Sequence, residues 1–318
     1  MSSLKTVTIE DIHNADRNIR PAVYETPLLT SDRLNAALPF DLYLKAESLQ
    51  RTGSFKFRGA CNAVFGLKDK KQSVIAFSSG NHAQAVAFAA KLSGRQATII
   101  MPKDAPTAKI EGTRSYGADV VLYDRYAESR EEIGAHYAKT TGGNLIKPYD
   151  DVRVIAGQGT AGSEIVRQLS ALSLTPDIMI SCCGGGGLIA GTAISLSNSF
   201  PNVKIFSAEP SLFDDTARSL AAGERISVDP DARSLCDAIV TPIPGEITFP
   251  INQKLLSGGL SVSDDEALQA MHVAASYLKV TLEPGGAVAL ASVLSQRFIE
   301  EQAGSDHRRI VVVIGSGG

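Results

Sequence analysis

The chain has 318 residues, 44% hydrophobic and 20% charged, which is typical of a globular protein long enough for two domains. Its formal net charge of −3, without a basic patch, excludes nucleic acid as an expected partner. No apolar run approaches the ~18 residues needed to span a membrane, and residues 1–11 lack the order of a signal peptide. We therefore expect a cytoplasmic protein with neither a membrane nor a nucleic-acid partner.

The first part of the chain predicts short elements that lead to a lysine. A helix is expected over 8–20, because a threonine cap and acidic residues begin it and a proline follows it. A short helix is expected near 31–37. Residues 41–47 alternate between apolar and polar side chains, as a half-buried strand does. A further helix is predicted to begin after Gly53 and to carry Lys56.

Residues 70–150 are expected to form a small domain, because short apolar runs alternate with helical segments throughout them. Such alternation is typical of a parallel sheet covered by helices on both faces. The predicted strands are 74–77, 97–101, 119–122 and 144–146, and the predicted helices are 82–92, 107–116 and 127–141.

A second alternation, from residue 154 onward, predicts a large domain made of residues 1–69 plus 151–318. Residues 223–263 are rich in Pro, Gly, Ser and Asp and are predicted to be surface connections. The fold class is therefore α/β, with two lobes that each contain a mostly parallel sheet covered by helices. The predicted helices of the large lobe are 154–172, 188–199, 264–278 and 285–298, and its later strands are 177–180, 203–208 and 309–314.

Four consecutive glycines at 184–187 separate an apolar strand from an apolar helix. Bare backbone N–H groups at the start of a helix bind anions, so we interpret residues 184–188 (the glycine loop) as a phosphate site. A flexible loop is the alternative, although such loops usually have polar neighbours. The loop lacks the Gly-Lys-Ser/Thr of a Walker motif and the spacing of a dinucleotide fingerprint. A compact phosphorylated cofactor is therefore favoured.

Lys56 lies between two phenylalanines at the predicted start of a helix. Desolvation and the positive end of the helix dipole both lower the pKa of an amine, which makes it a better nucleophile toward a carbonyl. For this residue taken alone, a solvated lysine on an amphipathic helix is the alternative.

Residues 78–81 (the serine turn), with the sequence Ser-Ser-Gly-Asn, follow a strand and open a helix. Small hydroxyls and free N–H groups at such a place suit a carboxylate, whereas a plain helix cap is the alternative. A nucleophilic lysine, a phosphate cradle and a carboxylate site together suggest pyridoxal phosphate acting on an amino acid.

With these motifs the chain resembles the serine racemase/threonine dehydratase branch of the fold type II (tryptophan synthase β-like) pyridoxal-phosphate enzymes. The motifs appear in the family's order over essentially the whole chain, and as an ordered set they are highly specific. They are Thr-Gly-Ser-Phe-Lys-Phe-Arg-Gly-Ala at 52–60, Ser-Ser-Gly-Asn-His at 78–82, Ile-Ala-Gly-Gln-Gly-Thr at 155–160, the glycine loop, Ala-Glu-Pro at 208–210, Glu-Pro-Gly-Gly-Ala at 283–287 and Ser-Gly-Gly at 316–318.

The resemblance implies a role for each matching residue. Lys56 would form the covalent link with the cofactor and later act as acid and base at the substrate Cα. The glycine-loop backbone would hold the cofactor phosphate, Ser316 would face the pyridine nitrogen, and Ser79 would lie opposite the lysine, as in family racemases. The implied cofactor contacts are Phe55, Lys56, Asn81, Gly184, Gly185, Gly186, Gly187, Leu188 and Ser316, and the implied substrate contacts are Ser78, Ser79, Gly80 and Asn81.

The resemblance also implies a divalent-cation site just after the strand predicted at 203–208. Its ligands would be Glu209, the carbonyl oxygen of Phe213, and Asp215. Ligands that are all oxygen suit Mg²⁺, Ca²⁺ or Mn²⁺. An acidic loop that holds no metal is the alternative.

The implied activity is that of an ammonia-lyase (dehydratase), which removes water from a β-hydroxy amino acid and yields a 2-oxo acid and ammonia. A serine racemase with side dehydratase activity is the alternative, and a non-enzymatic binder of the cofactor or an amino acid is a third reading.

Two cations, Arg33 and Lys147, stand where relatives carry other residues, and near the pocket they could bind a second carboxylate. Solvated surface charges are the alternative reading of both. We therefore expect L-serine, L-threonine or a 3-hydroxyaspartate as the substrate, and a homodimer as the assembly.

Overall fold

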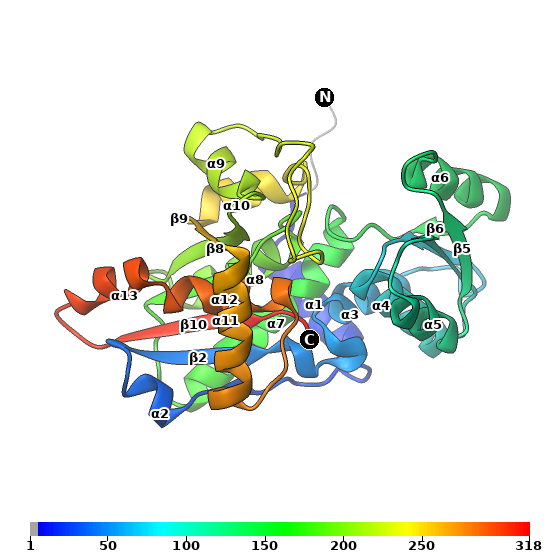
Figure 1. The fold of residues 1–318 in the computed structure, drawn as a ribbon. Helices are drawn as coiled ribbons and strands as arrows, with labels where there is room; N and C mark the ends of the chain where they lie inside the picture. The colour runs from blue at the N-terminus through cyan, green and yellow to red at the C-terminus, as the bar shows by residue number, and fades with distance from the viewer. Residues whose placement is uncertain (1–5) are drawn as a thin grey trace.

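The computed structural model describes residues 6–318 and contains two β-sheets, one in each lobe (Figure 1). Residues 1–5 of the predicted large domain, which also begin the segment compared with a signal peptide, lie outside the described residues. The larger sheet has the order β1 (Leu28–Leu29), β2 (Phe40–Ala46), β10 (Arg309–Gly315), β7 (Ile178–Cys182), β8 (Lys204–Pro210) and β9 (Gly258–Val262), and all its pairs are parallel except β1 with β2. The smaller, fully parallel sheet has the order β5 (Asp119–Tyr123), β4 (Ala97–Pro102), β3 (Val74–Phe77) and β6 (Asn144–Leu145).

The central strand of the larger sheet, β10, is its most apolar part. Val311, Val312, Val313 and Ile314 are all fully buried. A strand with helices over both faces needs apolar side chains on both sides, which explains this uninterrupted run. The predicted α/β class, with two lobes of mostly parallel sheet, is confirmed.

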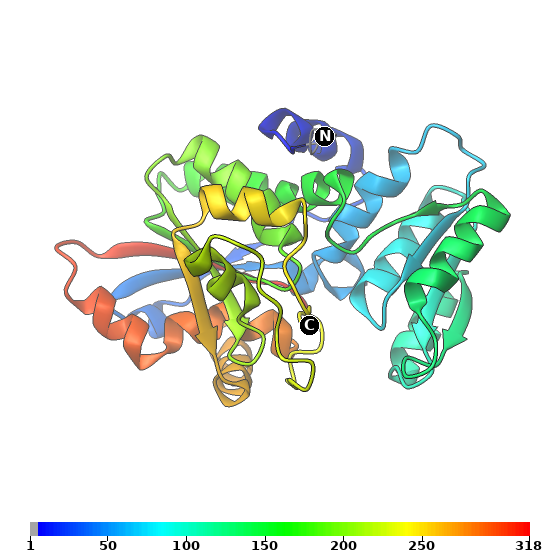
Figure 2. The ribbon, with the colours of Figure 1, turned by 90° about the horizontal axis from the view of Figure 1, so that it is seen from above.

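Helices cover both faces of the larger sheet (Figure 2). The helix α3 (Lys56–Phe65) lies between the two lobes, because it packs against α7 (Val152–Ala171) of the large lobe and α4 (Asn81–Leu92) of the small lobe. One face is covered by α7 and α8 (Gly187–Ser199), on which α1 (Ile9–Ile19) and α10 (Thr248–Leu255) pack. The other face is covered by α11 (Asp264–Val273), α12 (Pro284–Leu294) and α13 (Gln296–Ala303). The small lobe contains α4, α5 (Thr107–Ser115) and α6 (Arg130–Thr141), and the large lobe also holds α2 (Asp32–Asn35) and α9 (Asp215–Ala222).

Two predicted segments differ from the structure. Residues 223–263 are not only surface connections, because they contain α10 and the edge strand β9. Pro250 is tolerated in the first turn of α10, where a backbone N–H would lack a helical partner anyway. The single helix predicted over 285–298 is two helices, α12 and α13, which are separated at Ser295 by an extended backbone conformation.

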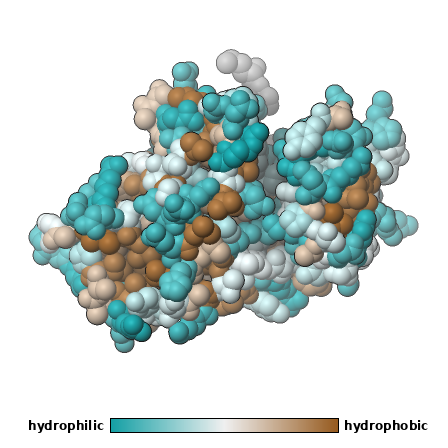
Figure 3. Space-filling model, viewed as in Figure 1, coloured by the Kyte–Doolittle hydropathy of each residue, from teal (hydrophilic) through white to brown (hydrophobic). Residues whose placement is uncertain are grey.

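The surface is hollowed between the two lobes (Figure 3). In the same view, apolar side chains gather on the larger lobe, whereas the smaller lobe is mostly hydrophilic. Across residues 6–318, no helix has the length and apolar character needed to cross a membrane.

Candidate active site

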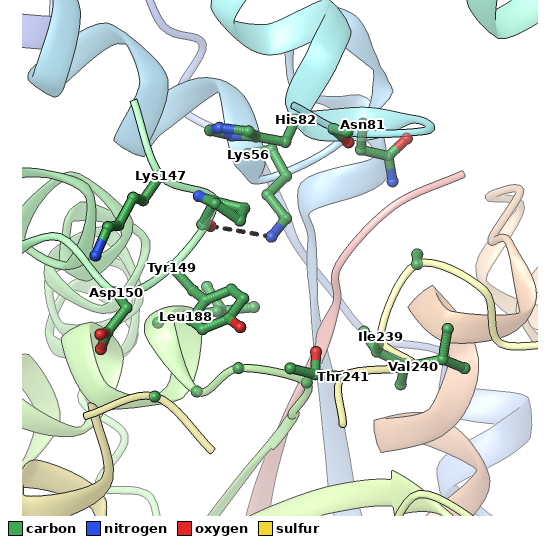
Figure 4. A pocket seen from close by; sticks show the side chains of 18 of the residues that line it. Lys56, Asn81, His82, Lys147, Tyr149, Asp150, Leu188, Ile239, Val240 and Thr241 are labelled. Carbon is green, nitrogen blue, oxygen red and sulfur yellow. Dashed lines mark hydrogen bonds between the residues drawn. The ribbon is translucent and has the colours of Figure 1, made fainter. Parts of the chain in front are cut away.

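A cavity of about 430 Å³ lies between the lobes and contains most of the predicted site. It is bounded by the serine turn of the small lobe, by the glycine loop of the large lobe, and by residues 147–150 (Figure 4). The predicted site residues that line it are Phe55, Lys56, Ser78, Ser79, Gly80, Asn81, Lys147, Gly184, Gly185, Gly186, Gly187 and Leu188.

Lys56 is the first residue of α3, and its side chain points into the cavity (Figure 4). Its Nζ donates a hydrogen bond to the carbonyl oxygen of Pro148 at 3.2 Å and lies 5.0 Å from the centre of the Phe55 ring. Burial lowers the pKa of this amine to about 8, although the nearby Cys182 and Glu283 act in the opposite direction. A fraction of Lys56 is therefore neutral and nucleophilic near physiological pH.

The glycine loop connects the carboxyl end of β7 to the N-terminus of α8. Gly186 has a φ of +86°, and Thr248 Oγ1 donates a hydrogen bond to the carbonyl oxygen of Gly185 at 2.7 Å. A Cβ at Gly185 would overlap the ring of Tyr149, which covers the loop in Figure 4. The first N–H groups of a helix lack partners within the helix, so this loop fits a phosphate group.

The serine turn lies at the carboxyl end of β3, immediately before α4. The N–H of Gly80 donates to Ser78 Oγ at 3.2 Å, and Asn81 Nδ2 donates to Glu283 Oε1 at 2.5 Å. The next residue, His82, is buried with Nε2 2.9 Å from a backbone carbonyl oxygen, and burial lowers its pKa to about 3. A neutral His82 therefore packs α4 in place, while the serine turn itself lines the cavity and fits a carboxylate.

Ser316 lies directly behind the cavity wall. Its Oγ accepts a hydrogen bond at 3.1 Å from Sγ of Cys182, a residue that lines the cavity. Its carbonyl oxygen accepts a hydrogen bond at 3.1 Å from the N–H of Phe55, the residue before the lysine. The turn after β10 is thus hydrogen-bonded to the segment that carries Lys56.

Arg33, which was predicted to contact the substrate, is not brought to the cavity. Its guanidinium lies 5.1 Å from the centre of the Tyr277 ring, outside the residues that line the cavity. Because β1 pairs antiparallel with β2, the chain returns to the amino end of β2 before α2 begins. Ligand sites in parallel sheets lie at the opposite, carboxyl ends of the strands. Lys147 does line the cavity, with an exposed side chain.

The predicted cation ligands lie outside the cavity, where β8 ends and α9 begins. Glu209 is fully buried and accepts hydrogen bonds from the N–H groups of Thr216 and Ala217 at 2.9 and 2.8 Å. Neither carboxylate oxygen of the buried Asp215 has a hydrogen-bond partner within residues 6–318. Burial and the neighbouring Asp215 raise the pKa of Glu209 to about 8, and burial raises the pKa of Asp215 to about 7. Asp215, with two unpartnered carboxylate oxygens beside the buried Glu209, fits a cation.

The third predicted ligand, Phe213, lies in the turn between these two carboxylates, and its N–H donates to the carbonyl oxygen of Pro210 at 2.7 Å. In the described part of the chain, no group of three or more His, Cys, Asp and Glu side chains is arranged to hold a metal. The predicted set contains only two carboxylates, so its third ligand would have to come from the backbone.

Several residues of the cavity had no predicted role. Tyr149 follows Lys147 by two positions, so it had a signal in the sequence. Lys109 had none, because only folding brings α5 of the small lobe against Asp237 in a loop of the large lobe. Glu283, which belongs to a motif that carries the family resemblance, is not among the lining residues but accepts a hydrogen bond from Asn81.

The sequence and the fold are both similar to those of known enzymes that act on amino acids. Residues 19–318 match the family described as pyridoxal-phosphate dependent enzyme. The chain is 42% identical to an L-threo-3-hydroxyaspartate ammonia-lyase of Saccharomyces cerevisiae, over 98% of this chain and 93% of that protein. It is 38% identical to a serine racemase of Dictyostelium discoideum, over 100% of this chain and 96% of that protein. The crystal structure of a threonine deaminase from T.th. is similar with a TM-score of 0.90 and 40% identity, over 98% of both chains.

Proposed function

Because this chain belongs to the family of pyridoxal-phosphate dependent enzymes, we propose that it is an ammonia-lyase that acts on a β-hydroxy amino acid. The proposal rests on one observation: a single cavity brings together Lys56, the glycine loop and the serine turn. Its preferred substrate in this proposal is L-threo-3-hydroxyaspartate, which is supported by the similarity to the yeast ammonia-lyase. L-Serine and L-threonine are the other candidate substrates.

The residues of the cavity fit pyridoxal phosphate. Lys56 would bind it covalently, the N–H groups of the glycine loop would hold its phosphate, and Phe55 and Asn81 would contact its ring. Ser316, which is hydrogen-bonded to the lining residue Cys182, would be the group on the side of the pyridine nitrogen. When bound, this cofactor withdraws electrons from the substrate Cα and thereby makes the Cα proton acidic.

The protein's own groups carry out the proton transfers. The serine turn holds the substrate carboxylate with neutral donors and so fixes the Cα proton toward Lys56. Lys56 accepts that proton, since its lowered pKa leaves part of the amine neutral. The β-hydroxyl leaves as water after it gains a proton from the now protonated Lys56, which returns the amine to its neutral form. The resulting enamine, once released, is hydrolysed to a 2-oxo acid and ammonia.

The test is a comparison of kcat/KM for L-threo-3-hydroxyaspartate, L-serine and L-threonine with purified, cofactor-loaded protein. We expect the value for the dicarboxylic substrate to exceed the others by at least about 10-fold, because a site with a cation for a second carboxylate discriminates by more than about 1 kcal/mol. Oxo-acid release without any activity on 3-hydroxyaspartates would contradict the substrate assignment. Formation of D-serine faster than oxo acid would favour the serine racemase alternative, which the similarity to the Dictyostelium protein supports.

We also propose that Glu209, the carbonyl oxygen of Phe213, and Asp215 hold Mg²⁺, Ca²⁺ or Mn²⁺. The buried, unpartnered carboxylate of Asp215 beside buried Glu209 supports this site. The cation would be structural or activating, because these residues do not line the cavity.

Divalent cation is expected to stabilise the protein against heat. At a concentration of about 100 times Kd, a ligand that binds only the folded state contributes ~2.7 kcal/mol. For a chain of this size we expect Tm to rise by about 5 °C when MgCl₂ or CaCl₂ is added to chelator-treated protein. Differential scanning calorimetry measures the shift. Asp215→Asn should remove it, and an equal shift in that variant would mean that the cation acts elsewhere.

The division into domains 1–69 plus 151–318 and 70–150, the homodimer and the cytoplasmic location stay predictions. The domain limits are supported by the smaller sheet, whose strands all come from residues 74–145.

A further inference from the structure

Besides Lys56, four cationic side chains line the cavity, and they differ in the partners that they already bind and in the direction in which they point. Arg225 donates from Nε to the carbonyl oxygen of Pro244 at 2.7 Å, and Arg130 donates from Nε to Glu131 at 2.8 Å. Figure 4 shows the exposed Lys147 pointing toward Asp150 and away from Lys56. The four cations are Lys109, Arg130, Lys147 and Arg225.

Lys109, on α5, is the cation that rests on the serine turn. A Cβ at Gly80 would lie only 3.2 Å from Lys109 Nζ, so the ammonium group sits directly against the expected carboxylate site. The side chain of Lys109 is 24% exposed. Its charge also acts on Glu283. Burial raises the pKa of Glu283, whereas the hydrogen bond from Asn81 and the charge of Lys109 lower it.

The ion pair that Lys109 makes in the structure is a loose one. Its Nζ is 3.5 Å from Oδ2 of Asp237, on the opposite lobe, and the Asp237 side chain is 55% exposed. Pairs of this length between partly exposed groups contribute little to stability. The ammonium of Lys109 can therefore exchange this partner for another carboxylate at low cost.

We infer that Lys109 binds the side-chain carboxylate of a dicarboxylic substrate and so determines specificity, with Asp237 as the partner it leaves. The inference rests on the proposed function and names a residue for its substrate preference. The neutral donors of the serine turn serve the α-carboxylate, whereas the second carboxylate needs a cation beside that turn. Of the four cations, Lys109 is the one placed against Gly80. Asp237 opposes the binding of a diacid, because it both competes for Lys109 and repels a carboxylate.

Two substitutions with opposite effects test this assignment. In Lys109→Gln we expect kcat/KM for L-threo-3-hydroxyaspartate to fall about 30-fold, mainly through KM, because a hydrogen bond to a charged group is lost. The value for L-serine should change by less than about 3-fold. In Asp237→Asn, KM for the diacid should decrease while KM for L-serine stays unchanged. Lys91→Gln, an exposed charge on α4 that does not line the cavity, is the matched control and should change neither substrate.

Binding without turnover provides a second readout. L-Aspartate lacks the leaving hydroxyl, so its Kd relative to that of L-alanine, measured from the absorption change of the bound cofactor, reports only recognition. We expect Lys109→Gln to weaken L-aspartate selectively. If the wild-type protein eliminates water from none of the hydroxy amino acids, the proposed lyase function fails, and this binding comparison still decides the role of Lys109.

Two results would overturn the inference. An equal loss for the diacid and for L-serine in Lys109→Gln would place Lys109 at the α-carboxylate or in a structural role. Diacid selectivity that survives in Lys109→Gln and disappears in Arg130→Gln would make Arg130 the cation for the second carboxylate.

Discussion

Replacing Lys56 by alanine is expected to lower kcat for water elimination by roughly 10⁴-fold or more, since it removes both the covalent attachment point and the acid/base at Cα. The same variant should lose the visible absorption band that the lysine-linked cofactor gives at about 410 nm. The reason lies in the cavity, where Lys56 is the cationic side chain placed between the serine turn and the glycine loop. Steady-state kinetics and an absorption spectrum of the purified variant measure both effects.

The pH dependence of cofactor loading gives an independent check on Lys56. Because burial lowers its pKa to about 8, covalent incorporation of pyridoxal phosphate into apoprotein should accelerate as the pH rises through 8 and level off above it. A lysine with its ordinary pKa would keep accelerating to much higher pH. Lys91→Ala is the control, and it should keep both the band and the activity. If Lys56→Ala retained the band, another residue would hold the cofactor and the proposed function would be wrong.

Replacing Arg58 by methionine is expected to lower the free energy of unfolding by roughly 3–5 kcal/mol, because it leaves buried carboxylates without their partner. Arg58 is fully buried and bonds Glu47 from Nε at 2.7 Å and from Nη2 at 2.8 Å. It also bonds Glu164 from Nη1 at 2.7 Å and from Nη2 at 2.8 Å, and Lys45 Nζ donates to the same Glu164 at 2.7 Å. The two cations and two carboxylates tie β2 and the turn after it to α3 and α7.

Urea denaturation of the apoprotein measures this loss. The matched control is Arg114→Met, which removes an exposed arginine paired with Glu111 at 2.6 Å and should cost no more than about 0.5 kcal/mol. In the double variant Arg58→Met, Glu47→Met, the pair Lys45–Glu164 remains and part of the stability should return. A loss below about 1 kcal/mol in Arg58→Met would mean that water or rearrangement satisfies the two carboxylates.

Two of the predicted site segments that the structure brings to the cavity follow strands. The serine turn follows β3 and the glycine loop follows β7, and both strands are parallel members of their sheets. Loops at the carboxyl ends of parallel strands form the ligand crevice, so motifs far apart in sequence converge there. Lys56 joins them because α3 packs between the two lobes.

The parts that the sequence did not predict depend on long-range pairing. Arg33 was expected near the pocket because it stands where relatives carry another residue, yet the antiparallel pairing of β1 with β2 carries it to the amino end of β2. The strand β9 begins with two glycines and is recognisable only through its pairing with β8. Lys109 and Asp237 are far apart in sequence, and no local pattern relates them.

The pairing of β2 with β10 has a consequence for how the protein matures. Phe40 pairs with Arg309 and Ala46 with Gly315, so these partners come from near opposite ends of the described chain. Closing so long a loop is slow, whereas the smaller sheet uses one continuous stretch and can fold while synthesis continues. The segment around Lys56 is therefore made early but is enclosed late, because its neighbour Ser316 arrives with β10. Cofactor capture is accordingly expected to be among the last steps of folding.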